Sequence, residues 1–227
     1  MSHPALSIIV PALNEALALP GTLTALATLD AALAREVIVV DGGSKDATCA
    51  IATQHGATVL RSATGRALQM NAGAAQARGE WLVFLHADTA LSEGALATIC
   101  ALPTTAQWGA FQQRFTGDDW RLRMISAAHN WRARFTGIHY GDQTLFVRRA
   151  LFAQVGGYAN DLIEDVLLSE TLRTHAPSNL LPQVSLTSSR KFEQLGVWRA
   201  LGYVLRIVWA RAQRRAPPVP QFFAPFR

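Results

Sequence analysis

The 227-residue chain has little cysteine, little lysine and few charged residues of any kind. Cys49 and Cys100 are its only cysteines, and their spacing forms neither a CxxC metal motif nor a disulfide framework, which favours a reducing compartment. The amino-terminus lacks the basic and apolar regions of a signal peptide, and no stretch reaches the roughly 18 apolar residues of a membrane span. We therefore expect a cytoplasmic protein, with contact at the inner face of the membrane left open.

Two common phosphate-binding motifs are also missing. No GxGxxG follows the first apolar strand and no GxxxxGK[ST] occurs anywhere, which argues against ordinary dinucleotide and P-loop sites. Hydrophobic residues make up 50% of the chain and charged residues 16%, which argues against a disordered protein. The chain is long enough to bury a sizeable core.

The formal net charge of +5 is unevenly distributed. Residues 190–227 hold eight basic side chains and one acid, whereas residues 1–189 hold 13 basic and 15 acidic side chains. The body is therefore mildly acidic and the end strongly basic. This distribution does not describe a nucleic-acid-binding body, so we expect no nucleic-acid partner.

Short apolar runs alternate with helical patterns along the first half. Strands are expected at 6–10, 36–40, 58–62 and 80–85, and helices at 17–29, 47–54 and 65–77. Crossover connections of this kind give parallel strands, and ligands of such sheets bind beyond the carboxyl ends of the strands. Polar residues gather at those ends: Asn14, Glu15, Asp41, His86 and Asp88.

The second half is less regular. We expect strands at 108–116, 143–148 and 183–188, and helices at 119–134, 149–155, 163–175 and 195–215. Trp120 and Trp131 share one helix face, which we interpret as packing, with sugar stacking as the alternative.

Three short constellations carry candidate chemistry, and each has a plainer interpretation. Asp41-Gly42-Gly43-Ser44 forms either a simple turn or a loop that lets a ligand approach the backbone. Asp88 either caps a helix or supplies a hard oxygen ligand for a metal. Glu164 and Asp165 either stabilise the start of a helix or include a general base.

Taken together, SIIVPALNE, EVIVVDGGSKDAT, GRALQMNAGAAQARGEWLVFLHADT, GDQTLFVRR, GGY and IEDVLLSETL resemble the family-2 glycosyltransferases. The likeness is closest to a compact bacterial branch, some members of which are named for arsenosugar biosynthesis. It implies an α/β protein of the GT-A nucleotide-diphospho-sugar transferase fold, with a mostly parallel central sheet flanked by helices on both faces. Residues 1–192 would form the catalytic domain, with 1–90 as the nucleotide-binding half and 91–192 as the acceptor half.

The resemblance implies an inverting, metal-dependent transferase that moves one sugar from a nucleotide-diphospho-sugar, a UDP- or GDP-sugar, to an unknown acceptor hydroxyl. Asp165 would be the general base, supported by Glu164, and Asp88 would hold Mn²⁺ or Mg²⁺ with the diphosphate. The nucleotide-sugar would contact Pro11, Asn14, Glu15, Asp41, Gly42, Gly43, Ser44, Arg66, Asn71, His86, Ala87 and Asp88. The acceptor would lie beside Gly141, Asp142 and Gln143.

The sequence departs from the family pattern in two places. His86 stands where the first Asp of the DxD motif is expected, which removes one negative charge from the metal site. The QxxRW motif of processive synthases is missing, which favours transfer of single sugars. In its place Arg190 and Lys191 follow the last expected strand, where they either neutralise the diphosphate or are solvated.

Residues 193–227 form a basic amphipathic helix and a Pro-rich tail in this interpretation. The segment 195–215 either packs on the catalytic domain or a second subunit of a homodimer, or contacts anionic lipid. Two other functions stay open. The first is a non-catalytic sugar-nucleotide binder at a membrane surface, because His86 weakens the metal motif. The second is a nucleotidyltransferase, although such an enzyme would have a glycine-rich loop after the first strand, where this chain has PALNEA.

Overall fold

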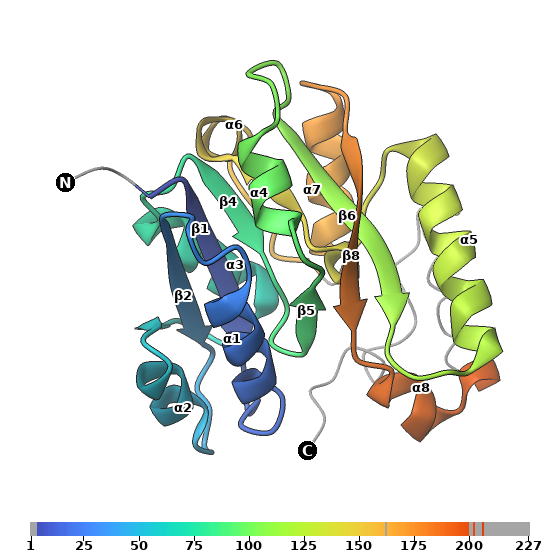
Figure 1. Cartoon of the computed structure of the whole chain (residues 1–227), viewed down its shortest axis with the longest axis horizontal. Coiled ribbons are helices and arrows are strands. Elements are labelled where there is room, and N and C mark those ends of the chain that lie inside the picture. Colours follow the sequence, from blue (N-terminus) through green and yellow to red (C-terminus); the bar gives the residue numbers. More distant parts are fainter. Residues whose placement is uncertain (1–3, 162, 200–201, 203–205, 207–227) are drawn as a thin grey trace.

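A computed structural model describes residues 4–161, 163–199, 202 and 206 (Figure 1). Its first half alternates strands and helices as expected: β1 (Leu6–Ala12), α1 (Leu19–Thr28), β2 (Arg35–Asp41), α2 (Thr48–Gln54), β3 (Thr58–Arg61), α3 (Arg66–Gln76) and β4 (Trp81–Phe84). β1 pairs in parallel with β2 and β4, and β2 pairs in parallel with β3. The prediction of parallel strands joined by helices is confirmed for this half.

The second half adds the remaining elements: β5 (Thr89–Leu91), α4 (Ala95–Cys100), β6 (Trp108–Phe115), α5 (Trp120–Thr136), the 3₁₀ turn η1 (Gly141–Gln143), β7 (Phe146–Arg148), α6 (Arg149–Gln154), α7 (Glu164–Arg173), β8 (Asn179–Thr187) and α8 (Arg190–Leu195). One sheet results, with the order β3-β2-β1-β4-β7-β6-β8-β5. β7 is antiparallel to β4 and β6, β8 is parallel to β6, and β5 is antiparallel to β8.

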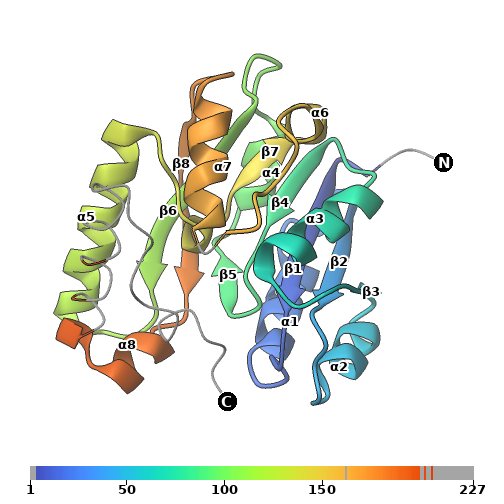
Figure 2. The same cartoon turned by 180° about the vertical axis from the view of Figure 1, so that it is seen from behind.

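The alternation of side chains along the strands separates two cores. Ile8 of β1 faces a core completed by α1, α2 and α4, whereas Ile9 faces a core completed by α3, α6 and α7. The two views show these helix groups on opposite faces of the sheet (Figures 1 and 2). Because both faces are covered, the central strands carry continuous apolar runs at Ile8–Ala12, Val37–Val40 and Trp81–Phe84.

A four-residue segment, 85–88, connects β4 to β5, although three strands separate these two in the sheet order. The Asp88 carbonyl accepts a hydrogen bond from the Ser188 N–H, just after β8. The segment that leaves β4 therefore contacts the chain just after β8. This segment carries His86 and Asp88.

Some elements differ from the sequence predictions. The strand expected at 143–148 begins only at Phe146, because Gly141–Gln143 form η1 and Thr144 has a φ of +49°. The short strand β5 was not predicted. α8 ends at Leu195, before Gly196 with its φ of +78°, and most of the helix expected at 195–215 lies outside the described residues. Among the described residues, no helix combines the length and the hydropathy needed to span a bilayer.

Candidate active site

The loops after β1 and β2 are tied together by reciprocal hydrogen bonds. The Asn14 N–H donates to Ser44 Oγ at 2.8 Å, and Asn14 Oδ1 accepts from the Lys45 N–H at 2.9 Å. The Glu15 N–H donates to Thr48 Oγ1 at 2.9 Å. Asn14 has a φ of +56°, a conformation that asparagine tolerates better than most residues. These contacts fix the two loops as one polar rim at the carboxyl ends of β1 and β2.

Asp41 is the buried anchor of this rim. Its carboxylate accepts hydrogen bonds from the Gly43 N–H at 3.2 Å and the Ser44 N–H at 3.0 Å. Burial raises the pKa of Asp41, but the hydrogen bonds from Ser44 and Gly43 outweigh it and hold the pKa below its usual value. Gly43 has a φ of +101°, so this turn requires glycine. Asp41 is therefore an ionised acceptor that shapes the loop.

Gln69 of α3 supports the same rim from beneath. Its Nε2 donates to the carbonyl oxygens of Ala12 and Val40, both at 2.8 Å, so it ties together the ends of β1 and β2. Gly42 lies against the Gln69 side chain, where a Cβ would be 3.0 Å from Cδ. The sequence interpretation missed Gln69, although a polar residue on the sheet-facing side of a helix was the available signal.

Three charged side chains meet on the other side of the rim. Arg190 Nη2, from α8, lies 3.6 Å from both Glu15 Oε2 and Asp88 Oδ2. All three side chains are partly exposed, at 45%, 32% and 27%. The structure thus brings Arg190 to Asp88, which sequence spacing alone could not show. The Lys191 side chain lies outside the described part of the structure.

The residues around Asp88 suit a metal ion that binds together with the phosphates of a substrate. Asp88 is an accessible carboxylate, and no group of three His, Cys, Asp or Glu side chains able to hold a metal occurs among the described residues. Mg²⁺ commonly binds through one or two carboxylates together with substrate phosphates. Asp88, with phosphate oxygens completing the coordination, fits such an ion.

Arg66 and Glu164 form a buried ion pair. Arg66 Nε, at the start of α3, lies 2.6 Å from Glu164 Oε1, at the start of α7. The Glu164 side chain is only 3% exposed, whereas that of Arg66 is 36% exposed. Burial raises the pKa of Glu164, and the guanidinium opposes that rise. Arg66, which was expected to face the donor, therefore has Glu164 as its partner.

Asp165 and His86 both lie against Gly141, the first residue of η1. A Cβ at Gly141 would collide with Asp165 Oδ2 and would lie 2.7 Å from His86 Nε2. Gly141 is fully buried, and only a residue without a side chain fits between these two groups. The segment after β4, η1 and the start of α7 thus bring His86, Gly141 and Asp165 together.

The environment of Asp165 favours its protonated form. Burial and the neighbouring Glu164 raise the pKa of Asp165 to about 7, against the pull of Arg66, and Asp142 adds to the rise. Asp165 Oδ1 is buried and has no hydrogen-bond partner among the described residues. A carboxylate that titrates near neutral pH and has an unused oxygen is suited to proton transfer.

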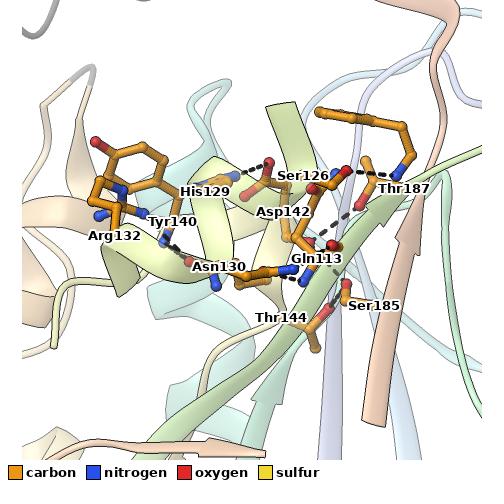
Figure 3. Close-up of polar contacts among 12 residues, drawn as sticks. Gln113, Ser126, His129, Asn130, Arg132, Tyr140, Asp142, Thr144, Ser185 and Thr187 are labelled. Atoms are coloured by element: carbon orange, nitrogen blue, oxygen red, sulfur yellow. Dashed lines mark hydrogen bonds and ion pairs between the residues drawn. The ribbon is translucent and has the colours of Figure 1, made fainter. Parts of the chain in front are cut away.

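A polar cluster lies between α5 and η1; we call Gln113, His129, Arg132, Tyr140 and Asp142 the α5–η1 cluster (Figure 3). His129 Nδ1 is 3.5 Å from Asp142 Oδ2, and the Arg132 guanidinium lies 3.8 Å from the Tyr140 ring centre. Burial lowers the pKa of His129, so the ring is neutral near pH 7. Gln113, His129 and Asp142 keep buried polar atoms without partners in the described structure. Such atoms suit a polar ligand or ordered water.

Two of the expected site residues make contacts within the protein. Both amide atoms of Asn71 bind the backbone of Tyr158, each at 2.9 Å, so Asn71 holds the segment before α7. Gln143 is fully buried; its Oε1 accepts from the Tyr140 N–H and its Nε2 donates to the Phe111 carbonyl. In the structure its contacts shape η1.

The other expected residues lie where the strands end. Asp142 is half-buried beside Asp165, and its carbonyl oxygen accepts from Ser185 and Thr187. Pro11 lies near the end of β1, and the buried Ala87 accepts a hydrogen bond from Thr22.

This sheet, with its flanking helices and polar strand ends, is the GT-A fold of nucleotide-diphospho-sugar transferases. The sequence pattern of glycosyl transferase family 2 matches residues 7–156, and the chain belongs to that family. Its fold is similar to the mannosyltransferase PcManGT from Pyrobaculum calidifontis, solved with GDP-Man and Mn²⁺, with a TM-score of 0.70 and 21% identity over 96% of this chain and 67% of that one. It is also similar to S. aureus TarS 1–349, with a TM-score of 0.65 and 20% identity over 88% of this chain and 65% of that one.

Curated relatives carry a glycosyltransferase name. A PGL/p-HBAD biosynthesis glycosyltransferase of Mycobacterium bovis (strain BCG / Pasteur 1173P2) is 32% identical over 171 residues, and one of Mycobacterium tuberculosis (strain ATCC 25177 / H37Ra) is equally similar. The match covers 70% of this chain and 64% of each relative, so the chain spans less than two thirds of their length.

Proposed function

We propose that this chain transfers a single sugar from a nucleotide-diphospho-sugar to an acceptor hydroxyl, with inversion at the anomeric carbon. The observation that carries the proposal is Asp165: a buried carboxyl with a pKa of about 7 and an unpartnered oxygen among the described residues. Family membership and the names of the relatives support the reaction class. The complexes of similar folds with UDP-GlcNAc and GDP-Man support a nucleotide-sugar donor.

The donor would lie along the carboxyl ends of β1, β2 and β4. The rim of Asn14, Asp41 and Ser44 offers a fixed polar surface for the nucleoside. Asp88 would hold a divalent metal, which neutralises charge on the leaving diphosphate when it is bound. Arg190, whose Nη2 lies 3.6 Å from Asp88 Oδ2, would offset the same charge.

The acceptor would approach from the η1 side. Asp165 takes the proton of the acceptor hydroxyl as that oxygen bonds to the anomeric carbon. The bond from that carbon to the diphosphate oxygen breaks, and its electron pair leaves with the nucleoside diphosphate. Because the pKa of Asp165 lies near neutral pH, the carboxylate is present and is still basic enough to accept the proton.

The Arg66–Glu164 pair favours a single displacement at the anomeric carbon over a double displacement. A retaining reaction would need a second carboxylate as nucleophile. Glu164 is the nearest candidate, but its side chain is 3% exposed and paired with Arg66 at 2.6 Å. Asp165 is thus the carboxylate left for the acceptor, and a single base-assisted displacement inverts the configuration.

The test is nucleoside diphosphate release from a panel of UDP- and GDP-sugars with Mn²⁺ and varied hydroxyl acceptors. Asp165→Asn should keep donor binding, measured by calorimetry, and lower kcat by about 10²- to 10⁴-fold, the usual range for a general base. Asp88→Asn should weaken donor binding in the presence of Mn²⁺. Full activity of Asp165→Asn would refute the base assignment.

The matched control is Asp118→Asn, an exposed carboxylate outside the site. It should leave turnover and donor binding unchanged. Donor binding without turnover across all acceptors would favour a non-catalytic binder. Diphosphate release from a nucleoside triphosphate would favour a nucleotidyltransferase.

A further inference from the structure

One face of α5 exposes large apolar side chains to solvent. Trp120, Met124, Trp131 and Phe135 are 56%, 60%, 67% and 69% exposed. At about 100° per residue these positions fall within one narrow sector of the helix, so they form a continuous stripe along it. We call these four residues the α5 stripe. The prediction that Trp120 and Trp131 serve packing is wrong, because neither is buried in the core.

The stripe spans most of the helix. At about 1.5 Å per residue, Trp120 and Phe135 lie roughly 22 Å apart along the axis. The Trp131 and Phe135 rings contact each other, with centroids 4.6 Å apart. Trp198, 65% exposed, follows Val197, which belongs to the same apolar cluster as Leu122 of α5. Soluble monomers seldom expose so much contiguous apolar surface without a binding role.

The charge of α5 identifies the partner. The helix carries four arginines and no acidic residue. Arg123 and Arg134 are exposed, and their helical positions place both along one side of the stripe. Helices that lie in the interface of an anionic membrane combine tryptophan and phenylalanine on one face with arginine beside it.

The position of α5 allows a flat surface to reach it. The helix lies at the outer edge of the molecule, beyond β6 and β8 and far from β3 (Figures 1 and 2). The sequence adds seven net positive charges over residues 190–227, which start at α8 beside α5. Each basic residue near an anionic surface adds attraction.

From these observations we infer that α5 docks the protein on a membrane surface containing anionic lipid, with the α5 stripe in the interface. The same helix contributes His129 and Arg132, which lie outside the stripe, to the α5–η1 cluster. If the proposed function holds, on which this consequence rests, docking places the acceptor side of the active site at the lipid surface. The acceptor class is then a hydroxyl on an amphipathic, membrane-borne molecule.

The test is flotation of the full chain with vesicles of phosphatidylcholine alone or mixed with phosphatidylglycerol. The wild type should bind only the mixed vesicles, and more weakly as salt rises. Trp131→Ser combined with Phe135→Ser should weaken binding by about tenfold or more, because two aromatic side chains no longer enter the interface. Arg123→Gln and Arg134→Gln should each weaken it by about fivefold.

The control is Leu17→Ser, which removes a 92% exposed leucine from the loop between β1 and α1. It should bind vesicles as the wild type does. Vesicle binding needs no sugar donor, so a failure of the proposed function would leave this measurement intact. Equal binding by the stripe variants, or none by the wild type, overturns the inference. If the wild type binds no vesicles, its oligomeric state decides what covers the stripe. A wild-type dimer that the stripe variant no longer forms assigns the stripe to a second copy of the chain. A wild-type monomer assigns it to another segment of this chain.

Discussion

Gly141 and Asp165 are in such close contact that the carboxylate oxygen Oδ2 occupies the place where a side chain of residue 141 would begin. The Gly141 N–H also donates a hydrogen bond to this carboxylate and lowers its pKa against the effect of burial. One backbone position therefore borders the proposed base directly and moderates a pKa that burial and Glu164 raise. Gly141 has no positive φ, so it is the available space that requires glycine here.

Gly141→Ala should reduce transfer much more than it reduces stability. The new methyl group displaces the Asp165 carboxylate or His86, and overpacking of this kind costs about 1–3 kcal/mol of unfolding free energy. We expect a fall in kcat of about 10²-fold, because a small misplacement of a catalytic group has this effect. Gly21→Ala is the control: no atom lies within 4 Å of its Cβ, so kcat and stability should be retained. Unchanged kinetics of Gly141→Ala would contradict the placement.

The rate should depend on the ionisation of Asp165. Burial and Glu164 raise the pKa of Asp165 to about 7, so the basic form is lost as pH falls through neutrality. With saturating donor, kcat should fall by about tenfold per pH unit below this value, as expected for one essential base. A profile that stays flat from pH 8 to about pH 5 would exclude a base with so high a pKa.

The same carboxyl should make stability depend on pH in a defined direction. The pKa of Asp165 is higher in the folded protein than in the unfolded chain, so the native state binds more protons between about pH 4 and pH 7. Its ionisation therefore lowers stability as pH rises through that window. Asp165→Asn should raise the thermal midpoint most at pH 8, and the gain should shrink toward pH 4. An equal gain at both pH values would indicate another cause.

Arg66→Met should destabilise the fold by about 2–3 kcal/mol, because it leaves Glu164 buried without its partner. Part of this cost disappears if Glu164 becomes protonated, so the loss should be smaller at low pH. Arg78→Met removes a 67% exposed guanidinium from Glu36, which keeps its hydrogen bonds from Ser7 Oγ and the residue 78 N–H, and should cost less than about 1 kcal/mol. Denaturant unfolding of both variants checks this difference. Equal costs would mean that burial of Glu164 contributes little.

Arg190→Gln should weaken donor binding and leave the fold intact. Arg190 is 45% exposed and makes long ion pairs with Glu15 and Asp88 and an exposed hydrogen bond to Ser188 Oγ, so little stability rests on it. If it moves onto the diphosphate, its loss should raise the donor Kd by about tenfold, the effect of losing one charge-assisted hydrogen bond. Arg190→Lys should restore part of the affinity. A Kd unchanged in both variants would leave Arg190 without a role toward the donor.

The sequence predicted the first half of the fold well because its signals there are local. Apolar runs define β1, β2 and β4, and the polar residues after them lie at one edge of the sheet because parallel strands end together. Sequence spacing could not reveal that Arg66 meets Glu164 or that Arg190 meets Asp88, since these pairs join distant elements.

Other differences have equally specific physical reasons. Asn71 looked like a donor contact because it lies in a motif that resembles the family, yet its amide satisfies the backbone of Tyr158. Gln69, two residues earlier, faces the strand ends instead, at the other side of the helix. Helical periodicity placed Trp120 and Trp131 on one face but does not say whether that face meets the core or solvent.

The link at residues 85–88 works as a tether of fixed length. Fully extended, its five peptide steps reach about 17 Å, whereas four strand spacings in a flat sheet amount to about 19 Å. The sheet can therefore never relax to a flat ribbon while β4 and β5 keep their places in the order. A single deletion here would pull β5 from β8, and an insertion would let the donor-side carboxylate of Asp88 drift from Arg190. At this segment, chain length should consequently be under selection in addition to the side-chain identity of Asp88.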